Sequence, residues 1–254
     1  MSTHKVGIAG LGVVGGGVAA MLEQNRDKIR ERTGADIVIT MAAEKDAARA
    51  GEVRLSQGRI VPDAEAILSD ATIDTVVEVI GGTGYAREFV LKAIDAGKNI
   101  VTANKALLAG HWGEIFDRAR AKGVSIGFEA SAAGGVPVVR TLREAYVGDN
   151  IQKIVGILNG TSNYILSRMT AEGGDFAEAL AGAQAAGYAE ADPTLDISGA
   201  DSAHKIAILA RLAFGEDFPI EEVYYEGISK VEQIDISYAL ELGYRIKLLA
   251  LAKF

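Results

Sequence analysis

The chain contains 254 residues, which is enough for one large domain or two ordinary ones, each with its own buried core. Hydrophobic residues make up 49% and charged residues 24%, a balance typical of soluble globular proteins. The net charge of −8 argues against a nucleic-acid partner, and the absence of cysteine excludes disulfide bonds, thiolate metal ligands and a cysteine nucleophile.

The N-terminus and the apolar runs indicate where the protein works. Met1 to Lys5 is short and polar, and a strand-like run follows at once, so the sequence predicts no secretion signal. The longest apolar runs are shorter than a membrane span. We therefore expect a cytoplasmic protein with no membrane partner.

The first half alternates short β-rich runs with longer amphipathic stretches. We predict strands at residues 6–9, 37–41, 75–79, 99–102 and 125–129. Helices are expected over residues 13–30 and 85–96, with Gly97 as the C-terminal cap of the second. Strands alternating with helices predict an α/β fold with a parallel sheet covered on both faces.

After about residue 130 the pattern changes. We predict a strand at residues 151–158, helices at 163–171, 176–186 and 200–214, a strand at 223–228, and a closing helix from about residue 237. The expected organisation is a Rossmann dinucleotide-binding domain over residues 1–130 and an α+β substrate-binding and dimerisation domain over residues 131–254.

A glycine motif supports the first assignment, because it directly follows the first predicted strand and begins the first predicted helix. Its residues are Gly10, Leu11, Gly12, Val13, Val14 and Gly15. The glycines provide a tight turn, close backbone approach to a pyrophosphate and close packing of helix on strand. The helix N-terminus adds free N–H groups and a partial positive charge. The sequence therefore predicts NAD or NADP binding here.

The end of the second predicted strand leaves the choice of dinucleotide open. Glu44 suits the ribose 2′-hydroxyl of NAD, whereas Lys45 and Arg49 suit the 2′-phosphate of NADP. Each of these charges is also compatible with an ordinary solvated surface position.

Four polar segments carry candidate chemistry: residues 102–105, 129–137, 156–164 and 187–193, the last leading to Asp196, Asp201 and Lys205. In this order after the glycine motif, they resemble homoserine dehydrogenase from Val6 to Ala250. The stretch GYAEADPT continuing to DSAHK is highly specific, and NGTSNYIL adds independent support. The resemblance implies NAD(P)-dependent interconversion of L-homoserine and L-aspartate 4-semialdehyde, a step of threonine, methionine and isoleucine biosynthesis.

The resemblance also implies roles for individual residues. Lys205 matches the proposed acid/base residue, and Lys105 matches a lysine beside the nicotinamide and the substrate. The expected substrate-binding residues are Asn159, Gly160, Thr161, Tyr188, Glu190, Asp196 and Asp201. Further cofactor contacts are expected from Thr102, Asn104, Lys105, Gly187 and Glu190. A sodium ion is expected on carbonyls of Glu129, Ala132, Gly134 and Val136, and the family is commonly homodimeric.

Hydride reduction of an aldehyde builds negative charge on its oxygen, so a proton donor or cation is needed there. A lysine can serve if burial or a second cation lowers its pKa from about 10.4, and Lys105 and Lys205 would influence each other if they converge. Asp201 and Lys205 share a helix face, which is equally typical of a solvent-exposed ion pair.

Two other functions remain open: another NAD(P)-linked oxidoreductase of small aldehydes, and a non-catalytic nucleotide-binding module. Homoserine dehydrogenases normally continue well beyond the point that matches Phe254, with a further glycine-rich segment near the cofactor. We therefore expect a second domain that is incomplete at its C-terminus.

Overall fold

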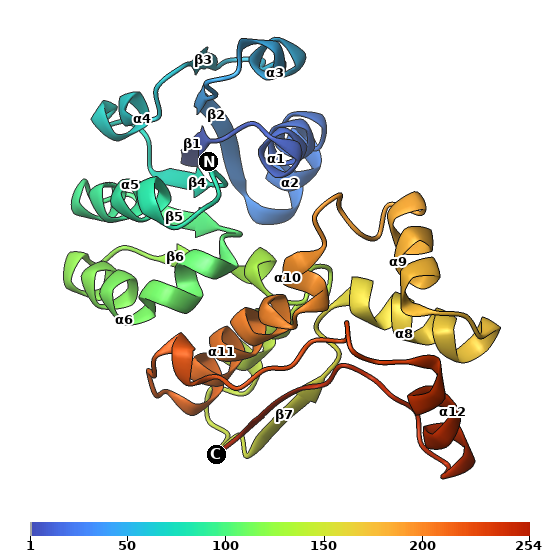
Figure 1. The fold of residues 1–254 in the computed structure, drawn as a ribbon. Coiled ribbons are helices and arrows are strands. Elements are labelled where there is room, and N and C mark those ends of the chain that lie inside the picture. Colours follow the sequence, from blue (N-terminus) through green and yellow to red (C-terminus); the bar gives the residue numbers. More distant parts are fainter. Residues whose placement is uncertain (1) are drawn as a thin grey trace. The chain divides into compact units, whose positions relative to one another are not determined.

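The computed structural model describes residues 2–254, and the chain divides into two compact units at Gly134 and Gly135. This division lies a few residues after the predicted boundary near residue 130. Figure 1 labels helices and strands of both units.

The first unit is built on a parallel sheet of six strands with the order β3-β2-β1-β4-β5-β6 (Figure 1). All five neighbouring pairs run parallel. The strands are β1 (Ser2–Ala9), β2 (Ala35–Ala43), β3 (Arg59–Val61), β4 (Thr75–Glu78), β5 (Asn99–Thr102) and β6 (Ile126–Gly127). The strand order reverses between β1 and β4, which is where open α/β sheets place their ligand crevice. The Rossmann prediction is confirmed.

The helices of this unit connect successive strands: α1 (Val13–Gln24), α2 (Arg26–Thr33), α3 (Ala47–Glu52), α4 (Glu65–Ser69), α5 (Gly84–Asp95) and α6 (Lys105–Lys122). Helix α5 buries the predicted face, and Gly97 follows its end at a φ of 72°. The prediction of a single helix over residues 13–30 is wrong, because this range contains α1 and most of α2. The chain breaks at Asn25, whose side-chain amide donates to the carbonyl of Met21, because asparagine competes locally for helical hydrogen bonds.

The strand predicted at residues 125–129 is also shorter than expected. Only Ile126–Gly127 pair with β5, and Glu129–Ser131 form a 3₁₀ turn, η1, that directs the chain out of the sheet. The hydroxyl of Ser131 donates to the carbonyl of Phe128 and closes this turn.

The second unit contains a two-stranded antiparallel sheet of β7 (Lys153–Gly156) and β8 (Ala250–Lys253). Its helical segments are α7 (Val138–Arg140), η2 (Thr141–Ala145), α8 (Gly160–Glu172), α9 (Phe176–Ala185), α10 (Thr194–Ile197), α11 (Ala200–Phe214), η3 (Ile220–Glu222) and α12 (Gln233–Glu241). An apolar core joins α8, α9 and α12 through residues such as Ile165, Met169 and Ile236. This unit has the expected mixture of helix and sheet.

Two predictions for this unit are wrong. Residues 223–228 form no strand; the Ile228 amide donates to the carbonyl of Ile197 instead, so the segment lies along the end of α10. The closing helix ends at Glu241, because Gly243 takes a left-handed φ of 82° that breaks the helical path. The apolar residues beyond it include the β8 strand.

The strand and helix that flank residue 159 are shifted as well. The predicted strand at 151–158 pairs only over Lys153–Gly156, and α8 begins at Gly160 rather than residue 163. Asn159 caps α8, since its side-chain oxygen accepts from the amide of Ser162 at 2.7 Å. None of the helices between residues 2 and 254 is long and apolar enough to cross a bilayer.

Candidate active site

The glycine motif forms the turn between β1 and α1, and its three glycines meet different surroundings. Gly10 has a φ of 99°, and a Cβ there would lie 2.7 Å from the Val79 carbonyl oxygen. A Cβ on Gly15 would lie 1.8 Å from the Gly10 carbonyl oxygen, whereas one on Gly12 would meet no atom within 4 Å. Gly10 and Gly15 are therefore required by the fold. Gly12 leaves open space where a pyrophosphate would approach, so the turn fits a dinucleotide.

The next residues of the motif lie at the helix N-terminus. Val13 is the first residue of α1 and its side chain is 96% exposed, and Val14 is also exposed. The motif therefore places the first turn of α1 at an open surface, where N–H groups and the helix dipole favour an anion.

Glu44 follows β2 directly and is held against this turn. One carboxylate oxygen accepts from the amide of Leu11 at 2.9 Å and the other from the amide of Asp46 at 3.0 Å. The pKa of Glu44 is lowered, chiefly by the hydrogen bond from Asp46 and then, against some desolvation, by that from Leu11. The charge faced by a ligand at this position is therefore negative at neutral pH.

The two cations considered for a 2′-phosphate have other neighbours. The Lys45 ammonium lies 5.3 Å from the centroid of the Tyr85 ring, and Arg49 lies 3.7 Å from the Asp46 carboxylate. Both side chains are on the exposed surface near Glu44.

A buried hydrogen-bond network connects the carboxyl ends of β4 and β5. Glu78 is fully buried; its carboxylate accepts from the amide of Ile80 at 3.0 Å and from the hydroxyl of Thr102 at 2.7 Å. Thr102 accepts in turn from the amide of Asn104, whose side chain caps α6 and donates to the carbonyl of Gly82 at 2.7 Å. Thr102 and Asn104 were predicted from the sequence as cofactor-binding residues, whereas Glu78 was not predicted as a functional residue. The available signal was an acid at the end of an otherwise apolar strand.

Lys105 begins α6 immediately after this network. It belongs to the first unit and Lys205 to the second, so the predicted mutual influence of the two ammonium groups stays a prediction.

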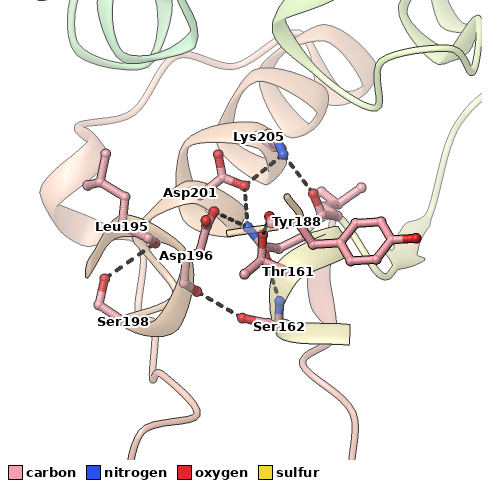
Figure 2. Close-up of polar contacts among 10 residues, drawn as sticks. Thr161, Ser162, Tyr188, Leu195, Asp196, Ser198, Asp201 and Lys205 are labelled. Carbon is pink, nitrogen blue, oxygen red and sulfur yellow. Dashed lines mark hydrogen bonds and ion pairs between the residues drawn. The ribbon is translucent and has the colours of Figure 1, made fainter. Parts of the chain in front are cut away.

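In the second unit, Asp196 and Asp201 both hydrogen-bond to Asn159, and Figure 2 shows Lys205 and Thr161 near the two acids. The Asn159 amide nitrogen donates to Asp196 at 2.6 Å and to Asp201 at 2.8 Å. The Lys205 ammonium donates to the same Asp201 oxygen at 2.7 Å and to the carbonyl of Leu158 at 2.8 Å. These residues come from the β7–α8 turn, α10 and α11, so the site is assembled across about 47 residues of sequence.

The Asp201–Lys205 pair is not the exposed surface ion pair that its spacing also permitted. The exposed fractions of the two side chains are 5% for Asp201 and 19% for Lys205. Burying charges is costly unless they are paired and hydrogen-bonded, and here both conditions hold. The remaining exposure of Lys205 is consistent with one face open to a ligand.

Asn159 itself is 4% exposed, and both its nitrogen and its oxygen are used within the protein. Its observed contacts are those of a residue that orients Asp196 and Asp201. Ser162 was not predicted as a site residue. Its hydroxyl donates to the backbone carbonyl of Asp196 at 2.9 Å and so helps to fix the position of this acid.

The other predicted substrate residues lie around this cluster. Thr161 is buried and its hydroxyl donates to the carbonyl of Tyr188 at 2.7 Å. The Tyr188 ring is 60% exposed, lies 4.8 Å from the Tyr164 ring centroid, and points away from Lys205 in Figure 2. Glu190 is exposed, with its backbone carbonyl bound by Gln184.

Two predicted glycines complete the set. Gly187 has a φ of 75° in the turn before Tyr188, and Gly160 is the first residue of α8. The ligand contacts predicted for Gly187, Gly160 and Glu190 stay predictions.

The predicted cation turn has an unusual backbone. Ala133 has a φ of 50° and Gly135 a φ of 85°, and the carbonyl of Val136 accepts from the amide of Val138 at 2.7 Å. Across residues 2–254, no group of three or more acidic or histidine side chains is arranged to hold a metal. A cation in this turn would therefore depend on backbone carbonyls, as predicted from Glu129, Ala132, Gly134 and Val136.

Comparison with known proteins extends these findings. A family model described as "Homoserine dehydrogenase, NAD binding domain" matches residues 10–129, and one described as "Homoserine dehydrogenase" matches residues 137–253. The homoserine dehydrogenase of Neisseria gonorrhoeae is 48% identical over 253 residues, covering 100% of this chain and 58% of its own length.

Solved structures are similar over the same range. A homoserine dehydrogenase from Thiobacillus denitrificans matches 99% of this chain and 58% of its own, with a TM-score of 0.94 at 46% identity. A putative homoserine dehydrogenase from Archaeoglobus fulgidus matches 98% of this chain and 80% of its own, with a TM-score of 0.87 at 31% identity. The chain thus spans a little more than half the length of its curated relatives.

Proposed function

The chain belongs to the homoserine dehydrogenase family, and from that premise we propose that it catalyses the NAD(P)-dependent interconversion of L-homoserine and L-aspartate 4-semialdehyde. The observation that carries the proposal is the buried cluster of Asp196, Asp201 and Lys205 around Asn159, in a chain that also has a dinucleotide turn. Neither a bare nucleotide-binding module nor an unrelated aldehyde reductase requires that cluster.

The cluster has the chemistry that an amino-acid substrate needs. Carboxylates of Asp201 and Glu190 would bind the substrate ammonium group, with Asn159, which also binds Asp196, holding Asp201 in place. When bound, the nicotinamide supplies or accepts the hydride. Lys205 would then donate a proton to the carbonyl oxygen as its negative charge develops, or accept one from the hydroxyl in the reverse direction. The family resemblance supports a place for Lys105 beside the nicotinamide, and Tyr188, Gly160 and Thr161 would line the substrate site.

The reaction is tested by following the near-ultraviolet absorbance of reduced cofactor with the purified protein, L-homoserine, and NAD or NADP. We expect the absorbance to rise only when homoserine is present. Cofactor binding without any homoserine-dependent signal would instead support the non-catalytic module. Turnover of other small alcohols in place of homoserine would support a different oxidoreductase.

A monovalent cation is part of the proposal, because the turn at residues 129–136 combines a left-handed alanine with a left-handed glycine. Such a backbone can direct several carbonyls to one side, which suits sodium better than a transition metal. The same assay in sodium, potassium and choline chloride tests this. Equal rates in all three salts would exclude a catalytic requirement for the cation.

We further propose that the protein prefers NAD to NADP, because the Glu44 carboxylate lies where a 2′-phosphate would approach. Glu44→Gln is expected to tighten NADPH binding and weaken NADH binding, changing the ratio of the two Kd values by roughly tenfold or more, as one charged hydrogen bond is lost. Fluorescence titration of both reduced cofactors measures this. Glu52→Gln, an exposed acid on the next helix, is the matched control; an unchanged ratio in Glu44→Gln would contradict the preference.

The protein is also proposed to form a homodimer through the β7–β8 sheet. Val155 and Leu251 are directly paired across the two strands and are 50% and 55% exposed, so they form an apolar surface on one face. Leu251→Lys is expected to shift the protein towards monomer in sedimentation velocity. Val147→Lys, at a residue exposed outside the sheet, should leave the oligomeric state unchanged. A wild-type protein that is monomeric at high micromolar concentration would refute the dimer.

A further inference from the structure

We propose that Glu78 is a positioning residue for the nicotinamide half of the cofactor, acting through the two loops that follow β4 and β5. The proposal rests on the proposed function, since it assumes a nicotinamide dinucleotide. It concerns a side chain that is fully buried and therefore acts without touching the ligand.

The topology of the sheet indicates where the two halves of the cofactor would lie. In the order β3-β2-β1-β4-β5-β6, the strands form two halves that meet between β1 and β4. A dinucleotide lies across this switch point, with its pyrophosphate on the turn after β1. The adenosine half then lies towards β2, where Glu44 is, and the nicotinamide half lies towards β4 and β5. The loops at residues 79–83 and 103–104 are the ones that follow those two strands.

Glu78 makes contacts at the ends of both strands. Its two carboxylate oxygens bind one group from each strand end, the amide of Ile80 and the hydroxyl of Thr102. The same Thr102 oxygen accepts from the Asn104 amide, and Asn104 reaches back to the carbonyl of Gly82. These hydrogen bonds therefore connect the loop after β4 to the loop after β5 at two places, through Glu78 and through Asn104. Glu78 is the fully buried member of the network.

The same network stabilises the conformation of the loop after β4. Gly81 and Gly82 have φ values of 84° and 69°, and a Cβ on either would meet no atom within 4 Å. Two successive left-handed glycines in open space give a loop few internal constraints of its own. The hydrogen bonds from Ile80 and to Gly82 are thus the described contacts that fix this loop relative to β5. Lys105, the first residue of α6, directly follows the other loop.

Glu78→Gln distinguishes a role of the Glu78 hydrogen bonds from a role of its side-chain volume, because glutamine is neutral and almost the same size. In Glu78→Gln, the new side-chain NH₂ must face one of the two partners of the Glu78 carboxylate. If it faces the Ile80 amide, two donors meet. If it faces the Thr102 hydroxyl, the hydrogen of that hydroxyl has no acceptor in the network. Either arrangement leaves one buried donor unsatisfied while the side-chain volume stays almost constant. Thr102→Val removes the hydroxyl and tests the same connection from the other strand.

The experiment compares two ligands by isothermal titration calorimetry: the reduced dinucleotide that the wild-type protein binds more tightly, and ADP-ribose, which lacks the nicotinamide. We expect Glu78→Gln and Thr102→Val each to raise the Kd of the dinucleotide about tenfold, with the Kd of ADP-ribose changed less than about twofold. The double variant should be little worse than either single one, because both act on one connection. Glu88→Gln, an exposed acid on α5, is the control.

The outcomes separate the two proposals. If Glu78→Gln weakens the binding of both ligands equally, Glu78 merely maintains the fold. If the effects of Glu78→Gln and Thr102→Val add in the double variant, the two residues act separately. Either result would overturn this inference and leave the proposed function standing. A wild-type protein that binds neither ligand would overturn the proposed function as well. If Glu78→Gln does not fold, Thr102→Val and Thr102→Ser carry the same comparison, with Thr102→Ser expected to retain dinucleotide binding.

Discussion

Replacing Lys205 by alanine is expected to reduce the turnover number for homoserine oxidation by roughly 10²–10⁴-fold, the usual contribution of a positioned general acid or base. The physical reason is that its ammonium, held between Asp201 and the Leu158 carbonyl, is the proposed proton donor to the substrate oxygen. Cofactor affinity should be largely unchanged, because the proposed role of Lys205 is proton transfer at the substrate oxygen.

The variant also leaves Asp201 without its ion-pair partner in a buried position, which by itself is destabilising. Thermal melting must therefore accompany the kinetics. Lys205→Arg retains the positive charge and should melt close to wild type while remaining severely impaired, since a guanidinium does not readily release a proton. Lys230→Ala, at an exposed lysine, is the surface control. Near-normal turnover in folded Lys205→Ala would remove Lys205 from the mechanism.

Alanine substitutions in the glycine motif are expected to have two distinct effects. Gly15→Ala places a Cβ 1.8 Å from the Gly10 carbonyl oxygen, so α1 must move away from β1 at a cost of roughly 1–3 kcal/mol in the free energy of unfolding. Gly12→Ala meets no protein atom, so its stability should be unchanged. Its methyl group would enter the space proposed for the pyrophosphate, and we expect the Kd of the dinucleotide to rise at least about tenfold.

Denaturant unfolding and cofactor titration of the same variants distinguish these effects. Gly17→Ala is the matched control, because Gly17 lies on the exposed face of α1 with no atom within 4 Å of an added Cβ. It should leave the Kd of the dinucleotide unchanged and raise the free energy of unfolding by about 0.5–1 kcal/mol, since alanine favours a helix over glycine. If Gly12→Ala bound the dinucleotide as well as Gly17→Ala does, the pyrophosphate would not lie on this turn.

Local pattern was enough to predict much of this fold. The helical spacing of apolar residues predicted α5 and α11 correctly, and the succession of short β-rich runs predicted the parallel sheet. The glycine motif was recognised because its constraint is local: Gly10 and Gly15 are incompatible with a side chain within a single turn. The family resemblance was carried by short motifs in the same way. In each case the determining contacts lie within a few residues along the chain.

What only the tertiary structure decided depends on contacts between distant residues. Substrate binding by Asn159 stays a prediction, but its amide also donates hydrogen bonds to Asp196 and Asp201, 37 and 42 residues away, which no local motif indicates. Glu78 gave no sequence motif, because its importance comes from Thr102 on the neighbouring strand. Residues 250–253 have apolar character compatible with either helix or strand, and pairing with β7 selects the strand. Periodicity records which face of an element is buried, but hydrogen-bond partners across the fold are set by topology.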